Sequence, residues 1–387
     1  MSVEEQYLTQ FKVGKKEIYA ARMAFFVPGF AISTWAPMIP MVKEELQIEA
    51  DVLGLLLLCI GISAFLVMPV AGFLGQLFGC KRVMIVCSLG MAIAVVMTSL
   101  FPNIWLCAFL LILLGIFMGI LDVNTNVNAV IVEKIAKKRL MSSMHAFWSI
   151  GCFLSAGIFS LLAKIGLPAI CITIIHGIII LVILLFFSKY FLSYKSSSKE
   201  KIIAIPKGIV IWFGILICVT FLGEGAVMDW SGVFLTEIKS IELSLAGIGY
   251  AIFSVAMLVV RLIGDKVVQI LGERKMVIFG SLLAGVGFFL VIFINELYLM
   301  PIGFMCIGLG AANIVPILYS MLKYQHDMPI NNAVTAITSM GYTGVILGPA
   351  LLGFVAHGFG ITSVFILLGG LFCLQVIIAY QVFKKLS

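Results

Sequence analysis

Long apolar runs separated by short polar segments cover nearly the whole chain. A helix needs about 20 apolar residues to cross a bilayer. Twelve runs of this kind lie near 18–41, 52–75, 83–101, 104–132, 144–164, 168–190, 208–232, 245–265, 276–294, 298–322, 331–355 and 361–383. Because the runs are apolar throughout, they do not show the alternation over about ten residues that marks the strands of membrane barrels. The pattern therefore predicts an all-α integral membrane protein with twelve transmembrane helices.

Composition excludes a water-soluble fold. Of the 387 residues, 62% are hydrophobic and 11% are charged, whereas soluble domains are roughly one quarter charged. The first run is too long for a signal-peptide core and lacks a small-residue cleavage site, so we expect it to be retained. The nine cysteines are scattered singly, which indicates neither a metal site nor a disulfide framework. We expect no cofactor, and no enzyme, since no nucleophile, base or metal set is clustered.

Basic residues indicate the orientation of the chain. Of the 25 Lys and Arg residues, two lie within spans, and 20 fall in the leader, the tail and the loops after the even-numbered spans up to span 10. Lys43, Lys164 and Lys239 fall on the opposite side. The positive-inside rule therefore predicts that both termini and the middle loop are cytoplasmic. The net charge of +7 thus indicates topology, and we expect no nucleic-acid partner.

The most polar stretch, Ser193–Ile202, lies near the midpoint of the chain. It predicts an N-terminal six-helix bundle over 1–192, a cytoplasmic linker over 193–207 and a C-terminal six-helix bundle over 208–387.

A weak internal repeat supports that division. The segment Gly72…Gly79-Cys80-Lys81-Arg82 after span 2 matches Gly264-Asp265-Lys266…Gly272-Glu273-Arg274-Lys275 after span 8, at an offset of about 193 residues. Gly29…Trp35 in span 1 matches Gly223…Trp230 in span 7 at nearly the same offset. Parallel repeats are a known transporter architecture, so we expect two bundles related by a pseudo-twofold axis.

These features resemble the major facilitator superfamily over essentially the whole chain, although Gln76 stands where the family has an acid in the loop after span 2. Several strings are similar to the fucose-permease-like branch of bacterial inner-membrane permeases: Asp122-Val-x-x-Asn126, His145-Ala-Phe-Trp-Ser149, Glu224-Gly-Ala-Val-Met-Asp-Trp-Ser231, Arg261-Leu-Ile-Gly-Asp265 and Gly341-Tyr-x-Gly…Gly348-Pro349. The resemblance implies a monomer in the bacterial inner membrane, whose two bundles rock around a central site.

The polar run Asp122–Asn128 interrupts the fourth span. A carboxylate in hydrocarbon costs roughly 2.5–3.5 kcal/mol on insertion scales, so it should face protein or water. Asp122, Asn126 and Glu133 share one helix face, and Asn124 lies roughly opposite. We expect Asp122 to carry a proton or bind solute and Asn126 and Asn124 to contact solute; an interhelical polar clamp is the alternative.

Glu224 is the second candidate for proton coupling. It lies well inside span 7 between two glycines, and a buried glutamate can exchange a proton as its access to water changes. A structural hydrogen bond is the alternative. Further solute-binding candidates are Asn313, Tyr342 and Trp35, and an interfacial position is the alternative for Trp35.

Other polar residues near span ends are candidates for gates. Arg22 either reaches the cytoplasmic surface or pairs with an acid, and Arg261 with Asp265 suggests a cytoplasmic charge latch. His145 suits a proton relay or a helix cap. The full set of gating candidates is Arg22, Glu133, His145, Asp229, Trp230, Arg261 and Asp265.

Together these observations predict a secondary active transporter of a small polar solute, sugar-like or another metabolite, with a proton as the partner ion. The chain has no phosphate-binding loop, so ATP is not expected to drive it. Sodium coupling, a uniporter or a proton-driven exporter on the same fold, and a non-transporting receptor are the alternatives.

Overall fold

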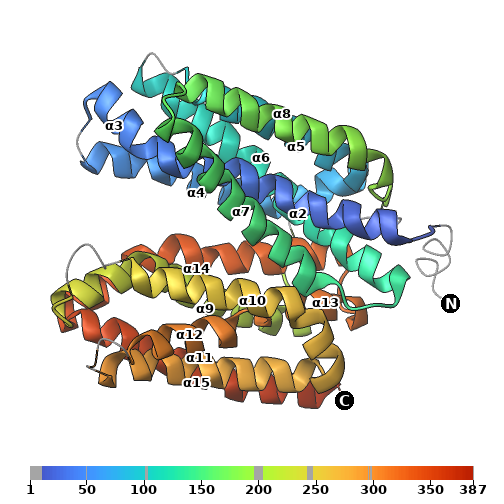
Figure 1. The fold of residues 1–387 in the computed structure, drawn as a ribbon. Helices are drawn as coiled ribbons and strands as arrows, with labels where there is room; N and C mark the ends of the chain where they lie inside the picture. Colours follow the sequence, from blue (N-terminus) through green and yellow to red (C-terminus); the bar gives the residue numbers. More distant parts are fainter. Residues whose placement is uncertain are drawn as a thin grey trace. The chain divides into compact units, whose positions relative to one another are not determined.

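The computed structural model describes residues 11–48, 50–100, 103–195, 204–241, 247–294, 296 and 299–386. Within these ranges every regular element is a helix (Figure 1). By length and composition, ten of the described helices can cross a membrane. Two further long helices, α2 (Lys15–Trp35) and α10 (Ile248–Leu271), lie at the first and eighth predicted spans. The prediction of an all-α membrane protein is confirmed.

The helices group into two compact units. Unit 1 comprises Met1–Leu140, Met144–Ile205 and Pro329–Thr335, and unit 2 comprises Met141–Ser143, Pro206–Met328 and Ala336–Ser387. The helices of unit 1, besides α2, are η1 (Ala36–Met38), α3 (Ile39–Leu46), α4 (Ala50–Phe78), α5 (Cys80–Met97), α6 (Ile104–Ala136), most of α7 (Met141–Lys164), α8 (Ala169–Phe187) and η2 (Ser188–Tyr190). The centre of the expected linker, 196–203, lies outside the described residues.

Unit 2 is built on the same plan. Its helices, besides α10, are α9 (Ile209–Glu237), α11 (Glu273–Phe293), α12 (Pro301–Ala311), α13 (Ile314–Met321), η4 (Leu322–Tyr324), most of α14 (Ile330–Phe359) and α15 (Ile361–Leu386). The first turn of α7 belongs to unit 2 and the start of α14 belongs to unit 1. The corresponding helix in each half of the chain therefore contributes its N-terminal end to the other unit.

Two glycines mark the repeated loops. Gly79 separates α4 from α5 with φ 86°, and Gly272 separates α10 from α11 with φ 82°. Residues with a Cβ rarely adopt a positive φ, so glycine is the residue that allows this abrupt change of direction. The sequence match between these two loops therefore has a conformational basis.

Close packing around two other glycines also repeats. A Cβ on Gly151 of α7 would meet the backbone of α2 at Phe26, and a Cβ on Gly344 of α14 would meet the backbone of α9 at Cys218. Small residues allow membrane helices to approach closely enough for extensive van der Waals contact. The first and fifth spans thus pack in unit 1 as the seventh and eleventh do in unit 2.

A third repeated contact corrects the register of the sequence match. Asn124 of α6 lies against Gly75 of α4, and Asn313 lies against Gly264 of α10. These contacts make Gly75, not Gly72, the equivalent of Gly264. The reason is that α10 runs about one turn further from Gly264 to its loop glycine, Gly272, than α4 runs from Gly75 to Gly79. One constant offset therefore cannot match both the helix glycines and the loop glycines.

Lys239 and Lys164, two of the three basic residues expected on the outer side, lie at helix C-termini. Lys164 is in the last turn of α7. Lys239 Nζ donates to the carbonyls of Ile292 (2.7 Å) and Ile294 (2.9 Å), where α11 ends. A cation is favourable there because the last carbonyls lack helical partners and the helix dipole is negative. These two exceptions to the charge rule therefore have a local structural reason.

Candidate functional site

The polar run of α6 contains side chains with different roles. Asn124 Nδ2 donates to the carbonyls of Ile120 (2.9 Å) on its own helix and Ala71 (3.1 Å) on α4. With its Oδ1 against Gly75, this side chain joins α4 to α6. Thr125 Oγ1 donates to the carbonyls of Leu121 and Asp122, each at 2.9 Å. Both side chains thus support the helix framework.

Asp122 and Asn126 form the second part of the run. Asp122 is 8% exposed and Asn126 is 1% exposed. Asn126 Nδ2 donates to the Asp122 carbonyl oxygen at 2.9 Å and to the Asp122 carboxylate at 3.4 Å. Asn126 Oδ1 is buried and has no hydrogen-bond partner among the described residues. The pair therefore presents an acid and an available amide acceptor inside unit 1.

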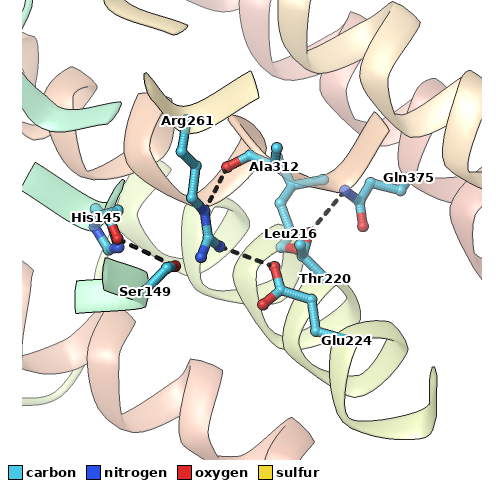
Figure 2. Close-up of polar contacts among 8 residues, drawn as sticks. All are labelled: His145, Ser149, Leu216, Thr220, Glu224, Arg261, Ala312 and Gln375. Atoms are coloured by element: carbon cyan, nitrogen blue, oxygen red, sulfur yellow. Dashed lines mark hydrogen bonds and ion pairs between the residues drawn. The ribbon is translucent and has the colours of Figure 1, made fainter. Parts of the chain in front are cut away.

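A proline creates a polar break in unit 2. The tenth span is divided into α12 and α13 at Ala312 and Asn313. Pro316 has no N–H and cannot donate to the carbonyl four residues earlier, which is that of Ala312. Arg261 Nε donates to this carbonyl at 3.2 Å instead (Figure 2). The break thus supplies a backbone acceptor that orients the guanidinium of Arg261.

The guanidinium of Arg261 also reaches α9. Its Nη2 lies 3.5 Å from Oε1 of Glu224, and the two side chains are 9% and 19% exposed (Figure 2). This contact joins two residues that lie 37 positions apart in the sequence. A buried charge needs a partner of opposite sign, and Glu224 is that partner here.

Asn313 remains available beside this pair. It is 2% exposed, and neither its Oδ1 nor its Nδ2 has a hydrogen-bond partner in the part of the chain that the structure describes. It follows Ala312 directly and packs on Gly264, three residues after Arg261 on α10. Both polar atoms of the Asn313 amide are therefore unused, whereas Asn124 uses its Nδ2 and leaves only its Oδ1 without a partner among the described residues.

A buried polar cluster that the sequence did not predict lies one turn before Glu224 on α9. Gln375 of α15 donates through Nε2 to Thr220 Oγ1 of α9 and Ser281 Oγ of α11, each at 3.1 Å, and Figure 2 shows its bond to Thr220. Thr220 is one turn before Glu224 on α9. Gln375, which has apolar residues for several positions on both sides, is a signal that could have identified the cluster, because such a side chain needs partners in a membrane.

Two acids predicted as gates accept backbone hydrogen bonds near the start of α7. Asp265 accepts from the N–H groups of Ser142 (3.0 Å) and Ser143 (3.1 Å). Glu133 is buried and accepts from the N–H of Leu140 at 2.8 Å. The first N–H groups of a helix have no internal acceptor and carry positive partial charge, so the Asp265 carboxylate stabilises this helix start.

The aromatic candidates lie in packed positions. Trp35 is buried at the end of α2, and Tyr342 lies edge-on to Phe221 with ring centroids 6.1 Å apart. Trp230 packs beside Gly353. The indole N–H groups of both tryptophans lack acceptors among the described residues.

The three remaining gating candidates lie on α2 (Arg22), α7 (His145) and α9 (Asp229). The guanidinium of Arg22 lies over the rings of Tyr19 and Phe147, at 5.3 and 5.9 Å from their centroids. His145 packs on Phe25 with ring centroids 5.0 Å apart. Asp229 is exposed on α9.

A cavity of about 510 Å³ lies elsewhere in unit 2, between the start of α9, the turn before α14 and the end of α15. Trp212, Tyr324 and Asp327 are among its lining residues. Asp327 accepts from the N–H of Ile209 at 2.8 Å and so has a capping role there. No described group of three His, Cys, Asp or Glu residues could hold a metal ion. The buried ion pair is therefore the stronger candidate for chemistry.

Comparison with known proteins agrees with this architecture. The family model of the Major Facilitator Superfamily matches residues 23–237 and 213–385. An uncharacterised MFS-type transporter of Yersinia pestis is 37% identical over 345 residues, which cover 89% of this chain and 90% of that protein.

Solved structures share the fold. The human organic anion transporter MFSD10 matches with a TM-score of 0.79 and 16% identity, covering 94% of this chain and 99% of that one. The Escherichia coli fucose:proton symporter FucP matches with a TM-score of 0.72 and 14% identity, covering 94% and 98%. With this fold and the family model matched along nearly its whole length, the chain belongs to the major facilitator superfamily of membrane transporters.

Proposed function

We propose that the protein is a secondary active transporter that moves a small polar solute by alternating access and couples this movement to protons. The observation that carries the proposal is the contact between Glu224 and Arg261 inside the membrane-spanning helices. Both ionised groups are costly in hydrocarbon, and paired ionisable residues in transmembrane segments commonly mark ion or substrate pathways.

The pair can respond to a proton in a simple way. Protonation of Glu224 removes its negative charge and most of its attraction for the guanidinium. Arg261 keeps its bond to the Ala312 carbonyl, so the loss of one partner does not leave it without an acceptor. The pair therefore has two arrangements that differ by one proton, as a coupling device requires.

Asp122 and Asn126 have a supporting role in this proposal, as a second acid and a solute-binding amide in unit 1. Asp265 and Glu133 act on gating through the backbone near the start of α7. The distribution of Lys and Arg supports both termini in the cytoplasm of a bacterial cell, with the protein in the inner membrane.

The test uses the purified protein in vesicles. A thermal-shift screen of sugars, sugar acids, amino acids and small organic acids identifies a solute. Its uptake is then followed with and without an imposed proton gradient. We expect gradient-driven accumulation in the wild type, and we expect Glu224→Gln to abolish accumulation while solute exchange across the membrane persists. Glu237→Gln is the matched control because Glu237 is exposed at the end of the same helix.

Three outcomes would contradict the proposal. Full accumulation by the Glu224→Gln protein would remove this residue from coupling. Wild-type uptake that ignores the gradient would indicate a uniporter. A solute that stabilises the protein but crosses in neither direction would indicate a receptor.

A further inference from the structure

We propose that the solute is a small organic anion whose carboxylate binds Arg261 at the position where Glu224 contacts the guanidinium in this structure. This inference rests on the proposed function and specifies its substrate class. A guanidinium offers five N–H donors in a planar fork that matches a carboxylate bidentately at about 2.7–2.9 Å. The contact with Glu224 joins one nitrogen to one oxygen at 3.5 Å, so Glu224 is a weaker partner than a freely positioned carboxylate would be.

The backbone around Arg261 fixes the orientation of the fork. Its Nε is bound to the carbonyl that Pro316 leaves without a helical donor. Binding through Nε holds the guanidinium plane and directs the Nη edge away from this carbonyl. Because this contact does not involve Glu224, the fork stays oriented when the acid is protonated. A solute carboxylate then meets a preorganised cation, which lowers the entropy cost of binding.

Asn313 supplies the second element of the site. It adjoins the Ala312 carbonyl in the chain, is almost fully buried, and both polar atoms of its amide lack partners among the described residues. A buried unsatisfied amide costs free energy unless a ligand or water satisfies it. Its Nδ2 can donate to a carboxylate or hydroxyl oxygen and its Oδ1 can accept from a hydroxyl group. This combination favours a hydroxylated carboxylate over a purely apolar acid.

Charge balance gives a further consequence. When ionised Glu224 pairs with Arg261, their two charges cancel. In the loaded site, Arg261 pairs with the solute monoanion and Glu224 carries the proton, so the site is again neutral. The other charges on α9 and α10 do not alter this balance. Asp229, Glu237 and Lys266 are exposed, and Asp265 is engaged by the backbone of Ser142 and Ser143. One proton therefore enters with one monoanion, and this step moves no net charge.

The experiment compares acids with neutral analogues of nearly the same shape. The probes are lactate with lactamide, glucuronate with glucuronamide, and benzoate with benzamide. Binding is measured by thermal shift and by titration calorimetry. Transport is measured in vesicles that contain a pH-sensitive dye, with the membrane potential clamped at zero or set negative inside. We expect at least one acid to bind and to acidify the lumen at a rate that does not change with the potential, and we expect its amide to bind at least tenfold more weakly.

Variants then test the role of Arg261. Arg261→Gln should weaken binding of the acid roughly 10- to 100-fold, the loss expected for a charge-assisted hydrogen-bonded contact. Arg261→Lys keeps the charge without the fork and should fall between. Glu224→Gln should retain binding of the acid because the glutamine resembles the protonated glutamic acid. If Arg261→Gln alone folds poorly, the double variant Glu224→Gln with Arg261→Gln removes both charges together and replaces it in the binding measurement. Lys207→Gln, which removes an exposed charge from the same unit, should bind like the wild type.

The outcomes separate this inference from the function on which it rests. Equal binding of acids and amides, or unchanged acid binding by Arg261→Gln, would overturn the anion assignment. Proton-coupled uptake of a neutral probe alone would also overturn it but would leave the proposed proton-coupled function intact. If probes bind but none moves with protons in the wild type, both proposals fall.

Discussion

Removal of one member of the Glu224–Arg261 pair should destabilise the protein more than removal of both. At 3.5 Å and an effective dielectric constant near 20, two unit charges attract by roughly 5 kcal/mol, and desolvation offsets part of this attraction. Breaking a buried pair by removing one partner costs about 3–5 kcal/mol, because the other charge is left uncompensated. We therefore expect Arg261→Gln to lower the free energy of unfolding by about 3 kcal/mol or more.

Glu224→Gln should cost less than Arg261→Gln, because the guanidinium keeps the Ala312 carbonyl as an acceptor. The double variant buries two neutral amides and should lie within about 1.5 kcal/mol of the wild type. The double-mutant cycle then gives a coupling energy of about 2–4 kcal/mol. Unfolding of the purified protein in mixed micelles with increasing denaturing detergent measures all four proteins on one scale.

An additive cycle would refute this reasoning. If the coupling energy is below about 0.5 kcal/mol, the two charges do not depend on each other and the contact is incidental. The pair Glu237→Gln and Lys207→Gln provides the control, since both side chains are exposed and their effects should add. A large cost for the double variant would show that the polar groups also hold the helices together through other partners.

Three other changes test the packing and the caps. Gly264→Ala places a methyl group against Asn313 and the Cβ of Ser142 and should cost about 1–3 kcal/mol; Asn313→Ala in the same chain should recover part of this, measured as the melting temperature. Asp265→Asn weakens the acceptor for two N–H groups at the start of α7, so we expect a loss of about 1–3 kcal/mol and altered uptake in vesicles. Lys239→Met removes two bonds to the last carbonyls of α11 and should cost about 0.3–2 kcal/mol by the same unfolding measurement.

Each of these predictions has a clear contrary result. A wild-type melting temperature for Gly264→Ala would mean that the helices separate easily to admit a methyl group. A normal uptake rate for Asp265→Asn would remove this acid from gating. For Lys239, the contrary result is that Lys239→Met and Lys239→Arg both unfold with the free energy of the wild type. This would show that the charge at this helix end has no effect on stability.

The sequence alone predicted much of the fold, because hydropathy along a helix is a local property. The predicted span 104–132 corresponds to α6, which runs Ile104–Ala136, and the predicted span 144–164 corresponds to α7, Met141–Lys164. A run of apolar residues long enough to cross a bilayer has few other stable states, since every backbone polar group must be satisfied inside the segment.

The partners of the polar side chains did not follow from the sequence. Asp122, Asn124 and Asn126 form one polar run, yet Asn124 joins α6 to α4 while Asn126 stays with Asp122. An asparagine can join two helices only where the neighbouring helix has a small residue that leaves room for it. For Asn124 this residue is Gly75, which is far away in the chain. The periodicity of a helix predicts the face of a residue but not what that face meets.

Thus the sequence by itself determined that this chain crosses the membrane many times, in which orientation it is expected to do so, and that Glu224 and Asp122 are buried acids in need of an explanation. Only the tertiary structure decided that Arg261 contacts Glu224 and the Ala312 carbonyl. The physical reason is that the free energy of transferring a residue into the membrane depends on that residue's own side chain, so the spans can be predicted from the sequence. The pairing of two charges depends on distances of a few ångströms between helices, which the packing of the whole unit sets.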